Sequence, residues 1–225
     1  MKISVIIPTL NEESCLARTI DRLWQESPAE VIVSDGGSED GTVRIALQHA
    51  TVLRVCRGRA VQQNAGAFRA CGDAVLFLHA DCWLESGWQE AIRRALSRPG
   101  CIAGCFRMCI DAEGWLYRAI ERGGDLRARW FGLPYGDQGI FMLRETFHRL
   151  GGFPPVAFME DLLFMRRARR FGRIAWVPLP IHISPRRWQR TRILRQTLRN
   201  WTLTALAVWG NVHPDRLRDY YPDVR

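Results

Sequence analysis

Lysine is almost missing from this sequence: of its 32 basic residues, 31 are Arg and one is Lys2. Long apolar runs are missing too, because no stretch reaches the roughly 18 residues that would span a bilayer. The seven Cys form no CxxC pair and lie mostly inside apolar segments. We therefore expect buried free thiols rather than a disulfide framework, and a reducing, cytoplasmic setting.

Glycine-rich phosphate-binding motifs are also absent. The turn after the first predicted strand has no G-x-G-x-x-G, and no segment matches the P-loop pattern. That turn reads Thr-Leu-Asn-Glu-Glu (9–13), which is acidic and unsuited to a triphosphate. This argues against a dinucleotide-dependent enzyme and weakens the alternative of a nucleotidyltransferase. The apolar core of the first residues is only six residues long, so we expect no signal peptide.

The charge that is present is unevenly distributed. Residues 1–143 hold 16 basic and 17 acidic residues, whereas residues 144–225 hold 16 Arg and 6 acids, so the whole excess of the formal net charge of +9 lies in the last third. With 47% hydrophobic and 24% charged residues, the composition indicates a folded protein. The basic excess points to an anionic partner: a phosphorylated substrate, a membrane surface or nucleic acid.

Hydrophobic patterning predicts a mostly parallel α/β sheet flanked by helices. Strands are expected at 3–8, 30–35, 51–55 and 73–81, with helices at 12–26, 42–48 and 58–71 between them, the first capped by Asn11. This alternation favours right-handed crossovers. The pattern then loosens, with helices at 86–97, 113–129 and 160–171 and strands at 101–110, 139–144 and 173–178. We expect one domain over 1–186 and an amphipathic helical extension over 187–225.

Three predicted strands end in polar residues. Glu12 follows the first strand, Asp35 closes the second and Asp81 closes the fourth. The carboxyl ends of such strands meet at one crevice, where α/β sheets bind ligands. A carboxylate there suits Mg²⁺ or Mn²⁺, and nitrogen ligands from His79 or His182 would favour Mn²⁺.

Four segments in this order resemble glycosyltransferase family 2, whose members have the GT-A fold. They are IIPTLNEE, VSDGGSEDGT, FLHAD and MEDLLFMRRARRFG, and the resemblance covers roughly residues 3–190. GRAVQQNAGA, GDQGIF and SPRRW narrow it to small bacterial enzymes that accompany radical-SAM proteins and are assigned to arsenosugar biosynthesis. The resemblance implies transfer of a sugar from a UDP- or GDP-linked donor to a small-molecule or lipid acceptor, with a divalent cation.

The resemblance also implies roles for individual residues. Asp35 would hydrogen-bond the base, and Asp81 would bind the metal as the last residue of an Asp-x-Asp signature in which His79 replaces the first Asp. His182 is a further metal candidate. The other residues expected around the nucleotide sugar are Pro8, Thr9, Asn11, Glu12, Gly37, Arg59, Asn64, His79 and Ala80.

The reaction implied is an inverting transfer. Asp161 is the expected general base, with Glu160 as second choice, although acids also favour helix N-termini for purely structural reasons. Arg186 and Arg187 would neutralise the departing diphosphate, since guanidinium groups bind phosphate oxygens bidentately. Asp137 and Gln138 would contact a sugar, a weaker expectation because GDQG is also an ordinary turn sequence.

The segment after residue 187 combines Trp188, Trp201 and Trp209 with several Arg. Such a basic amphipathic helix packs on its own domain, on a second subunit of a homodimer, or on the inner face of a membrane. A competing hypothesis makes the chain a non-enzymatic binder of nucleic acid or membrane. That hypothesis leaves the three acidic strand ends unexplained, so we expect no nucleic-acid partner.

Overall fold

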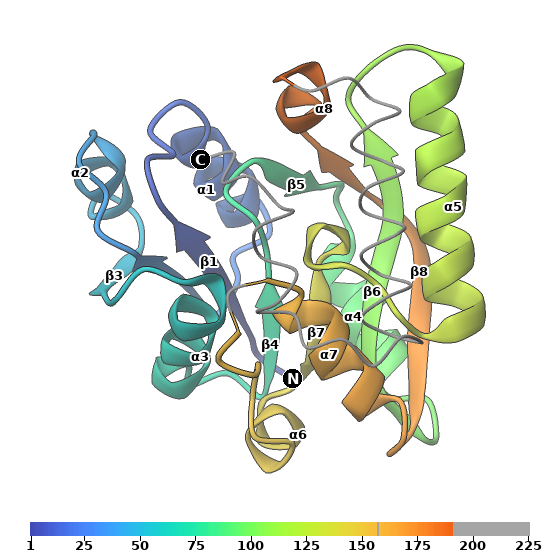
Figure 1. Ribbon diagram of the computed structural model, residues 1–225. Coiled ribbons are helices and arrows are strands. Elements are labelled where there is room, and N and C mark those ends of the chain that lie inside the picture. The colour runs from blue at the N-terminus through green and yellow to red at the C-terminus, as the bar shows by residue number, and fades with distance from the viewer. Residues whose placement is uncertain (157, 191–225) are drawn as a thin grey trace.

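The computed structural model describes residues 1–156 and 158–190, and these form one sheet with helices on both faces (Figure 1). Within this range the strand order is β3-β2-β1-β4-β7-β6-β8-β5. The strands are β1 (Ile3–Thr9), β2 (Glu30–Asp35), β3 (Thr51–Arg54), β4 (Ala74–Phe77), β5 (Cys82–Leu84), β6 (Cys101–Ile110), β7 (Ile140–Leu143) and β8 (Arg173–Ile183). The helices are α1 (Leu16–Trp24), α2 (Thr42–Ala46), α3 (Arg59–Arg69), α4 (Trp88–Leu96), α5 (Trp115–Phe131), the 3₁₀ turn η1 (Gly136–Gln138), α6 (Arg144–Arg149), α7 (Glu160–Ala168) and α8 (Arg186–Arg190).

The first half of the sheet is parallel, as the alternating sequence predicts. β1 pairs in parallel with β2 and β4, and β2 pairs in parallel with β3. Every residue of β1 is buried, which explains its unbroken apolar run. The side chains of β1 alternate between two cores: Ile3, Val5 and Ile7 pack with α1 and α4, whereas Ile6 packs with α3 and α7.

The second half of the sheet is mixed. β7 runs antiparallel to both β4 and β6, β6 runs parallel to β8, and β5 runs antiparallel to β8. The prediction of a mostly parallel α/β sheet is confirmed, but these reversals are set by pairings between distant segments. Periodicity in the sequence does not reveal them.

Helix α5 completes the hydrogen bonding of strand β6. β6 is paired with β7 only at Ala103 and Gly104. Further along, the backbone N–H groups of Met108 and Ile110 donate to the carboxylates of Asp125 and Glu121 on α5. Burial raises the pKa of both carboxyl groups above the ordinary values for Glu and Asp.

Several predicted boundaries are wrong. Asn11 is no N-cap, because α1 begins at Leu16 and Asn11 lies in the left-handed region with φ 54°. The fourth strand ends at Phe77 rather than at Asp81, so 78–81 form a turn between β4 and β5. β8 continues past Pro178 to Ile183, because a register shift against β6 accommodates the prolines that cannot donate to a ladder.

The predicted C-terminal helical extension lies almost wholly outside the described residues. Of the described elements, only α8 overlaps it. Within the described part of the chain, no helix combines the length and the apolar character that crossing a membrane requires.

Candidate active site at the carboxyl edge of the sheet

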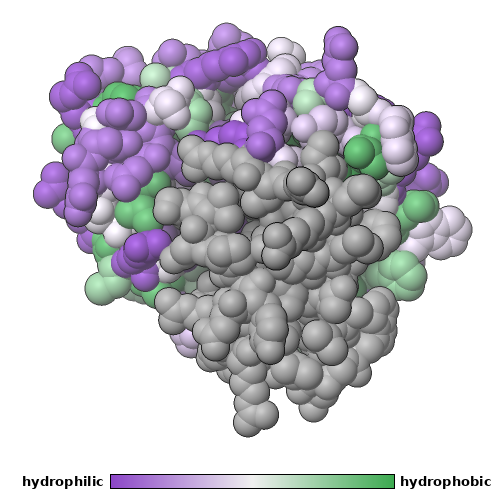
Figure 2. Space-filling model, turned by 45° about the horizontal axis from the view of Figure 1, so that its top comes forward, coloured by the Kyte–Doolittle hydropathy of each residue, from purple (hydrophilic) through white to green (hydrophobic). Residues whose placement is uncertain are grey.

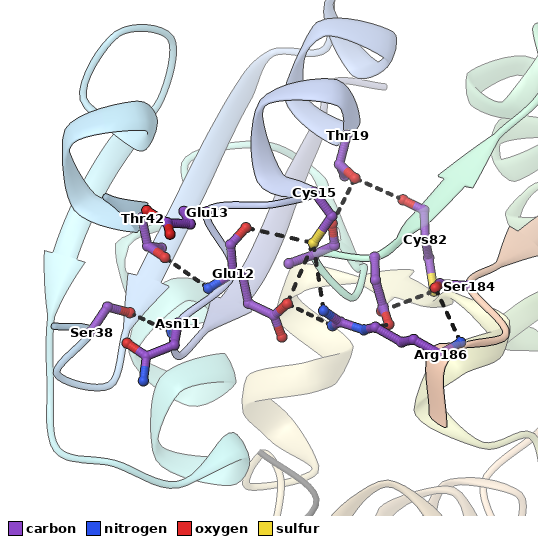
Figure 3. A network of polar contacts seen from close by, with 12 residues as sticks. Asn11, Glu12, Glu13, Cys15, Thr19, Ser38, Thr42, Cys82, Ser184 and Arg186 are labelled. Carbon is purple, nitrogen blue, oxygen red and sulfur yellow. Dashed lines mark hydrogen bonds and ion pairs between the residues drawn. The ribbon is translucent and has the colours of Figure 1, made fainter. Parts of the chain in front are cut away.

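Three segments meet at one edge of the sheet: the loop after β1, the loop after β2 and the β4–β5 turn. Helix α8 lies at the same edge (Figures 1 and 3). The first two loops are hydrogen-bonded to each other. The backbone N–H of Asn11 donates to Ser38 Oγ, and Glu39 N–H donates to Asn11 Oδ1. Glu12 N–H donates to Thr42 Oγ1, 2.8 Å away. The polar residues of SDGGSEDGT therefore shape the loops of the site.

Asp35 is fully buried and both of its carboxylate oxygens are engaged. Oδ1 accepts from the hydroxyls of Thr9 and Ser38, and Oδ2 accepts from the backbone N–H groups of Gly37 and Ser38. A carboxylate offers about four acceptor positions, so these bonds use them all. Gly37 allows the turn because its φ is +95°. In this structure Asp35 organises the loop that the resemblance assigns to base recognition.

Gln62 is a site residue that the sequence does not reveal. Its side chain is 1% exposed, and Nε2 donates to the carbonyl oxygens of Thr9 and Ser34 at 2.7 and 2.8 Å. These carbonyls close β1 and β2, so Gln62 from α3 fixes the ends of both strands. A buried amide between two strand ends has no local signature, because it is recognised only through its partners.

Arg186 joins the ends of β1 and the β4–β5 turn (Figure 3). Its Nη2 lies 2.6 Å from Glu12 Oε2, and its Nε lies 2.8 Å from Asp81 Oδ2. Burial works against the charge of Arg186, but the two carboxylates outweigh it and raise the pKa of the guanidinium. The predicted meeting of the acidic strand ends is therefore confirmed for Glu12 and Asp81, with an arginine between them.

Cys15, which directly precedes α1, and Thr19 in its first turn complete this network. Cys15 Sγ lies 3.4 Å from Glu12 Oε2. Burial is the larger cause and the negative charge of Glu12 the second, and together they raise the pKa of the Cys15 thiol to about 12. Thr19 Oγ1 donates to the carbonyl of Ala80 at 2.7 Å, which fixes the turn that carries Asp81. Ala80 thus contributes its backbone to the site.

Glu160, at the first turn of α7, is held by an arginine. Its side chain is 1% exposed, and Oε1 lies 2.7 Å from Nε of Arg59 on α3. A second contact joins Arg59 Nη2 to Glu160 Oε2 at 3.5 Å. This bidentate pairing binds α7 to α3 and commits the Glu160 carboxylate, which disfavours Glu160 as a general base.

Asp161 has different surroundings. Its Oδ2 accepts from the backbone N–H of Gly136 in η1, and its Oδ1 accepts from the N–H of Leu162. A methyl group on Gly136 would lie 3.1 Å from both Asp161 Oδ2 and His79 Nε2. Asp161 and His79 therefore face the same small space, and no arginine is bonded to Asp161 among the described residues.

Two of the residues predicted to contact the nucleotide sugar, Asn64 and Gln138, form other contacts in this structure. Asn64 binds both the carbonyl and the N–H of Phe153, so it fixes the loop before α7. Gln138 is fully buried and bonded to Arg127 and Asp125, away from the site, so its expected sugar contact is not supported. Asp137 lies beside Gly136 in η1, and Pro8 lies buried within β1. The side chain of Arg187 lies outside the described part.

The structure does not bring His182 to Asp81. His182 Nδ1 lies 2.7 Å from Asp111, Nε2 lies 3.0 Å from Glu85, and the ring stacks on Trp83. Asp81 instead lies with His79 and Cys82, whose candidate ligand atoms are all within 4.8 Å of one another. The expected pairing of His182 with Asp81 at one metal is not observed.

The sequence model described as "Glycosyl transferase family 2" matches residues 4–162. The chain belongs to this family. The matched range begins in β1 and ends just after Asp161, so it contains the network around Glu12 and Asp81 and the first turn of α7. Arg186 lies beyond the matched range.

Two curated proteins of known name are similar to this family 2 chain. Glycosyltransferase AglE of Haloferax volcanii is 35% identical over 102 residues, which are 38% of this chain and 34% of AglE. The O-antigen chain rhamnosyltransferase RfbN of Salmonella typhimurium is 26% identical over 200 residues, which are 73% of this chain and 60% of RfbN. The chain thus spans about a third of one relative and three fifths of the other.

Solved structures confirm the GT-A-type fold expected of the family. A mannosyltransferase from Pyrobaculum calidifontis, in complex with GDP-Man and Mn²⁺, matches 94% of this chain and 65% of its own with a TM-score of 0.71 at 21% identity. Glucosyl-3-phosphoglycerate synthase from Mycobacterium tuberculosis, in complex with Mn²⁺, UDP and glucosyl-3-phosphoglycerate, matches 99% of this chain and 81% of its own with a TM-score of 0.65 at 23% identity.

Proposed function

We propose that this protein transfers a sugar from a nucleoside-diphosphate donor to an acceptor hydroxyl with inversion. Family membership supports sugar transfer, and the UDP and GDP-Man complexes of similar structures support a nucleotide-linked donor. The observation that carries the proposal is the separation of roles at the carboxyl edge. Arg186 lies between Glu12 and Asp81, while Asp161 lies across from His79 without a cationic partner among the described residues.

Asp161 is the proposed general base. Its carboxylate takes the proton of the acceptor hydroxyl, whose oxygen attacks the anomeric carbon. The bond between that carbon and the diphosphate oxygen breaks, and its electron pair leaves with the diphosphate. The N–H groups of Gly136 and Leu162 orient the carboxylate, and Arg186 supplies positive charge for the diphosphate once it exchanges its carboxylate partners for phosphate oxygens.

The residues around Asp81 fit a divalent cation. The carboxylate of Asp81 is the ligand type that Mn²⁺ prefers, the imidazole of His79 lies within 4.8 Å of it, and similar structures contain Mn²⁺; the thiol of Cys82 in the same cluster is a soft ligand that suits Mn²⁺ less. We propose that Asp81 holds the ion with His79 beside it. When bound, such an ion neutralises charge on the diphosphate. Asp81 would be available to such an ion once it no longer pairs with Arg186, whose guanidinium would then be free for phosphate oxygens.

The domain boundary, the acceptor and the setting extend the proposal. Residues 1–186 form the catalytic domain, with 187–225 as an appended segment. The acceptor is a small molecule or a lipid, and the reaction takes place in the cytoplasm. The narrower resemblance to arsenosugar-associated enzymes stays a prediction that the two named relatives do not test.

A thermal-shift panel tests the proposal directly. UDP, GDP and CDP are each added with and without Mn²⁺ to the full chain. We expect one nucleotide to raise the unfolding temperature, with a larger rise when Mn²⁺ is present, because a ligand that binds only the folded state stabilises it. Silence from all three nucleotides would overturn the donor assignment.

Donor hydrolysis then identifies the sugar. The enzyme is incubated with UDP- and GDP-linked sugars, and release of nucleoside diphosphate is measured by chromatography. Hydrolysis confined to one donor would name the base and sugar together. The anomeric configuration of a product made from that donor, read by NMR, decides between inversion and retention.

A further inference from the structure

Helix α5 presents an exposed apolar stripe that the proposed function does not use. Trp115, Ala119, Leu126 and Trp130 fall within about 60° of one another around the helix, at 100° per residue. Trp115 and Trp130 are 77% and 74% exposed, and Leu126 is 55% exposed. Phe131, the last residue of α5, is exposed, and so is Phe171, which follows two residues after Arg169, whose guanidinium donates to the Phe131 carbonyl. In Figure 2, green hydrophobic residues stand among pale and purple ones at the right edge, the side on which α5 stands in Figure 1.

The exposed charges that α5 itself carries beside this stripe have one sign. The two acids within α5, Glu121 and Asp125, turn inward and bind the backbone of β6. Arg122 and Arg129 remain exposed along the stripe, and neither forms an ion pair among the described residues. The outer face of α5 therefore combines tryptophan, leucine and unpaired arginine.

A basic groove continues the same face. Arg129 lines it together with Arg98, Arg173 and Trp176, and its volume is about 350 Å³. No carboxylate belongs to the described residues that line the groove. Arg98 lies shortly before β6, and Arg173 is the first residue of β8. Both strands run in the same direction as β4, because β4 and β6 are each antiparallel to β7 and β8 is parallel to β6. The groove therefore lies at the edge of the sheet opposite the Asp81 site and is separate from it.

We propose that the outer face of α5 and the groove beside it bind the surface of an anionic bilayer. Tryptophan side chains prefer the boundary between headgroups and acyl chains, and arginine binds phosphate while its stem stays on apolar surface. The groove offers three guanidinium groups to headgroup phosphates, and the stripe offers its apolar side chains to the acyl boundary. A protein partner would be expected to match the apolar stripe with acids for the arginines, and such a partner is an outcome of the test.

The experiment is co-sedimentation of the full chain with vesicles of phosphatidylcholine alone and of phosphatidylcholine with one quarter phosphatidylglycerol. We expect binding to the anionic vesicles only, weakened by salt. Arg122→Glu/Arg129→Glu should lower the partition coefficient at least about tenfold, and Trp115→Ala/Trp130→Ala should lower it comparably. Circular dichroism melting checks that each variant is folded.

Two control variants separate this face from bulk properties. Arg69→Glu/Arg149→Glu changes the net charge by the same amount on exposed sites of α3 and α6, and Phe68→Ala removes an isolated aromatic that is 84% exposed. Both should bind like the parent chain. Equal loss in the Arg69→Glu/Arg149→Glu variant, unchanged binding by the α5 variants, or no binding at all would overturn the proposal. The proposal would also be overturned if the parent chain bound no vesicles but formed a dimer by light scattering, and if the Trp115→Ala/Trp130→Ala variant were a monomer.

Discussion

The two sides of the candidate active site are built differently. On the side of β1 and β2, neighbouring loops and strand ends are joined by hydrogen bonds that involve no cationic side chain, and Asp35 and Gln62 use their capacity internally. On the side of the β4–β5 turn, α7 and α8, contacts are mainly ion pairs between distant segments, such as Arg186 with Glu12 and Asp81. Buried hydrogen bonds of this kind resist exchange, whereas a phosphate or a cation can replace one partner of an ion pair. Substitutions on the first side should therefore affect stability, and those on the second side ligand binding and catalysis.

The largest expected effect belongs to Asp161→Asn. Removing the general base should lower kcat by about 10²–10⁴-fold, while nucleotide affinity changes little. Steady-state kinetics on the donor identified above and a nucleotide titration measure the two. Glu160→Gln is the control at the neighbouring residue. It breaks the ion pair with Arg59, so it should lower the unfolding temperature, while kcat falls far less than in the Asp161→Asn variant. Normal turnover by the Asp161→Asn variant would refute the base assignment.

Gln62→Leu should show the opposite pattern. The change leaves the carbonyls of Thr9 and Ser34 without their donor, at a cost of about 2–4 kcal/mol in the free energy of unfolding. Urea denaturation measures this loss, and Gln48→Leu on an exposed site provides the control. Gln48→Leu should unfold at the same urea concentration as the parent chain. If Gln62→Leu does so too, Gln62 does not hold the ends of β1 and β2 together as described.

Arg186→Gln tests the exchangeable side with two effects of opposite sign. Loss of the guanidinium should weaken binding of the nucleoside diphosphate about tenfold, since a charge-assisted bond is lost. The same change frees Asp81 and should strengthen binding of Mn²⁺ alone. Calorimetry measures both, with Arg94→Gln, from an exposed pair with Glu90, as control. Two changes of the same sign would mean that Arg186 does not exchange partners.

The smallest effect concerns Cys15. Its pKa of about 12 keeps the thiol protonated at pH 8, and only the thiolate reacts with iodoacetamide. Cys15 should therefore be alkylated far more slowly than the exposed Cys56, and raising the pH to 10 should leave it largely protonated. Peptide mass spectrometry after timed labelling compares the two residues. Labelling of Cys15 as fast as Cys56 would show that the network around Glu12 opens readily.

The sequence predicts the parallel half of the sheet well, because each buried strand there is a short β-branched run bounded by turn residues. It misses β5 and α6, which are too short for a periodic pattern and are fixed by distant partners. It predicts that Glu12 and Asp81 meet, since strand ends of one sheet share an edge. It does not predict that Arg186, 174 residues from Glu12, joins them, or that Arg59 pairs with Glu160, 101 residues away.

The carboxylates that α5 extends to β6 have a consequence for solubility. Beyond Gly104, β6 has no strand on the side of β7 within the described residues, so its N–H groups would be a template for a strand of another molecule. Asp125 and Glu121 occupy the donors of Met108 and Ile110, and the helix covers the strand sterically. Helix α5 thus prevents a strand of another molecule from pairing with β6, while its opposite face is exposed to solvent.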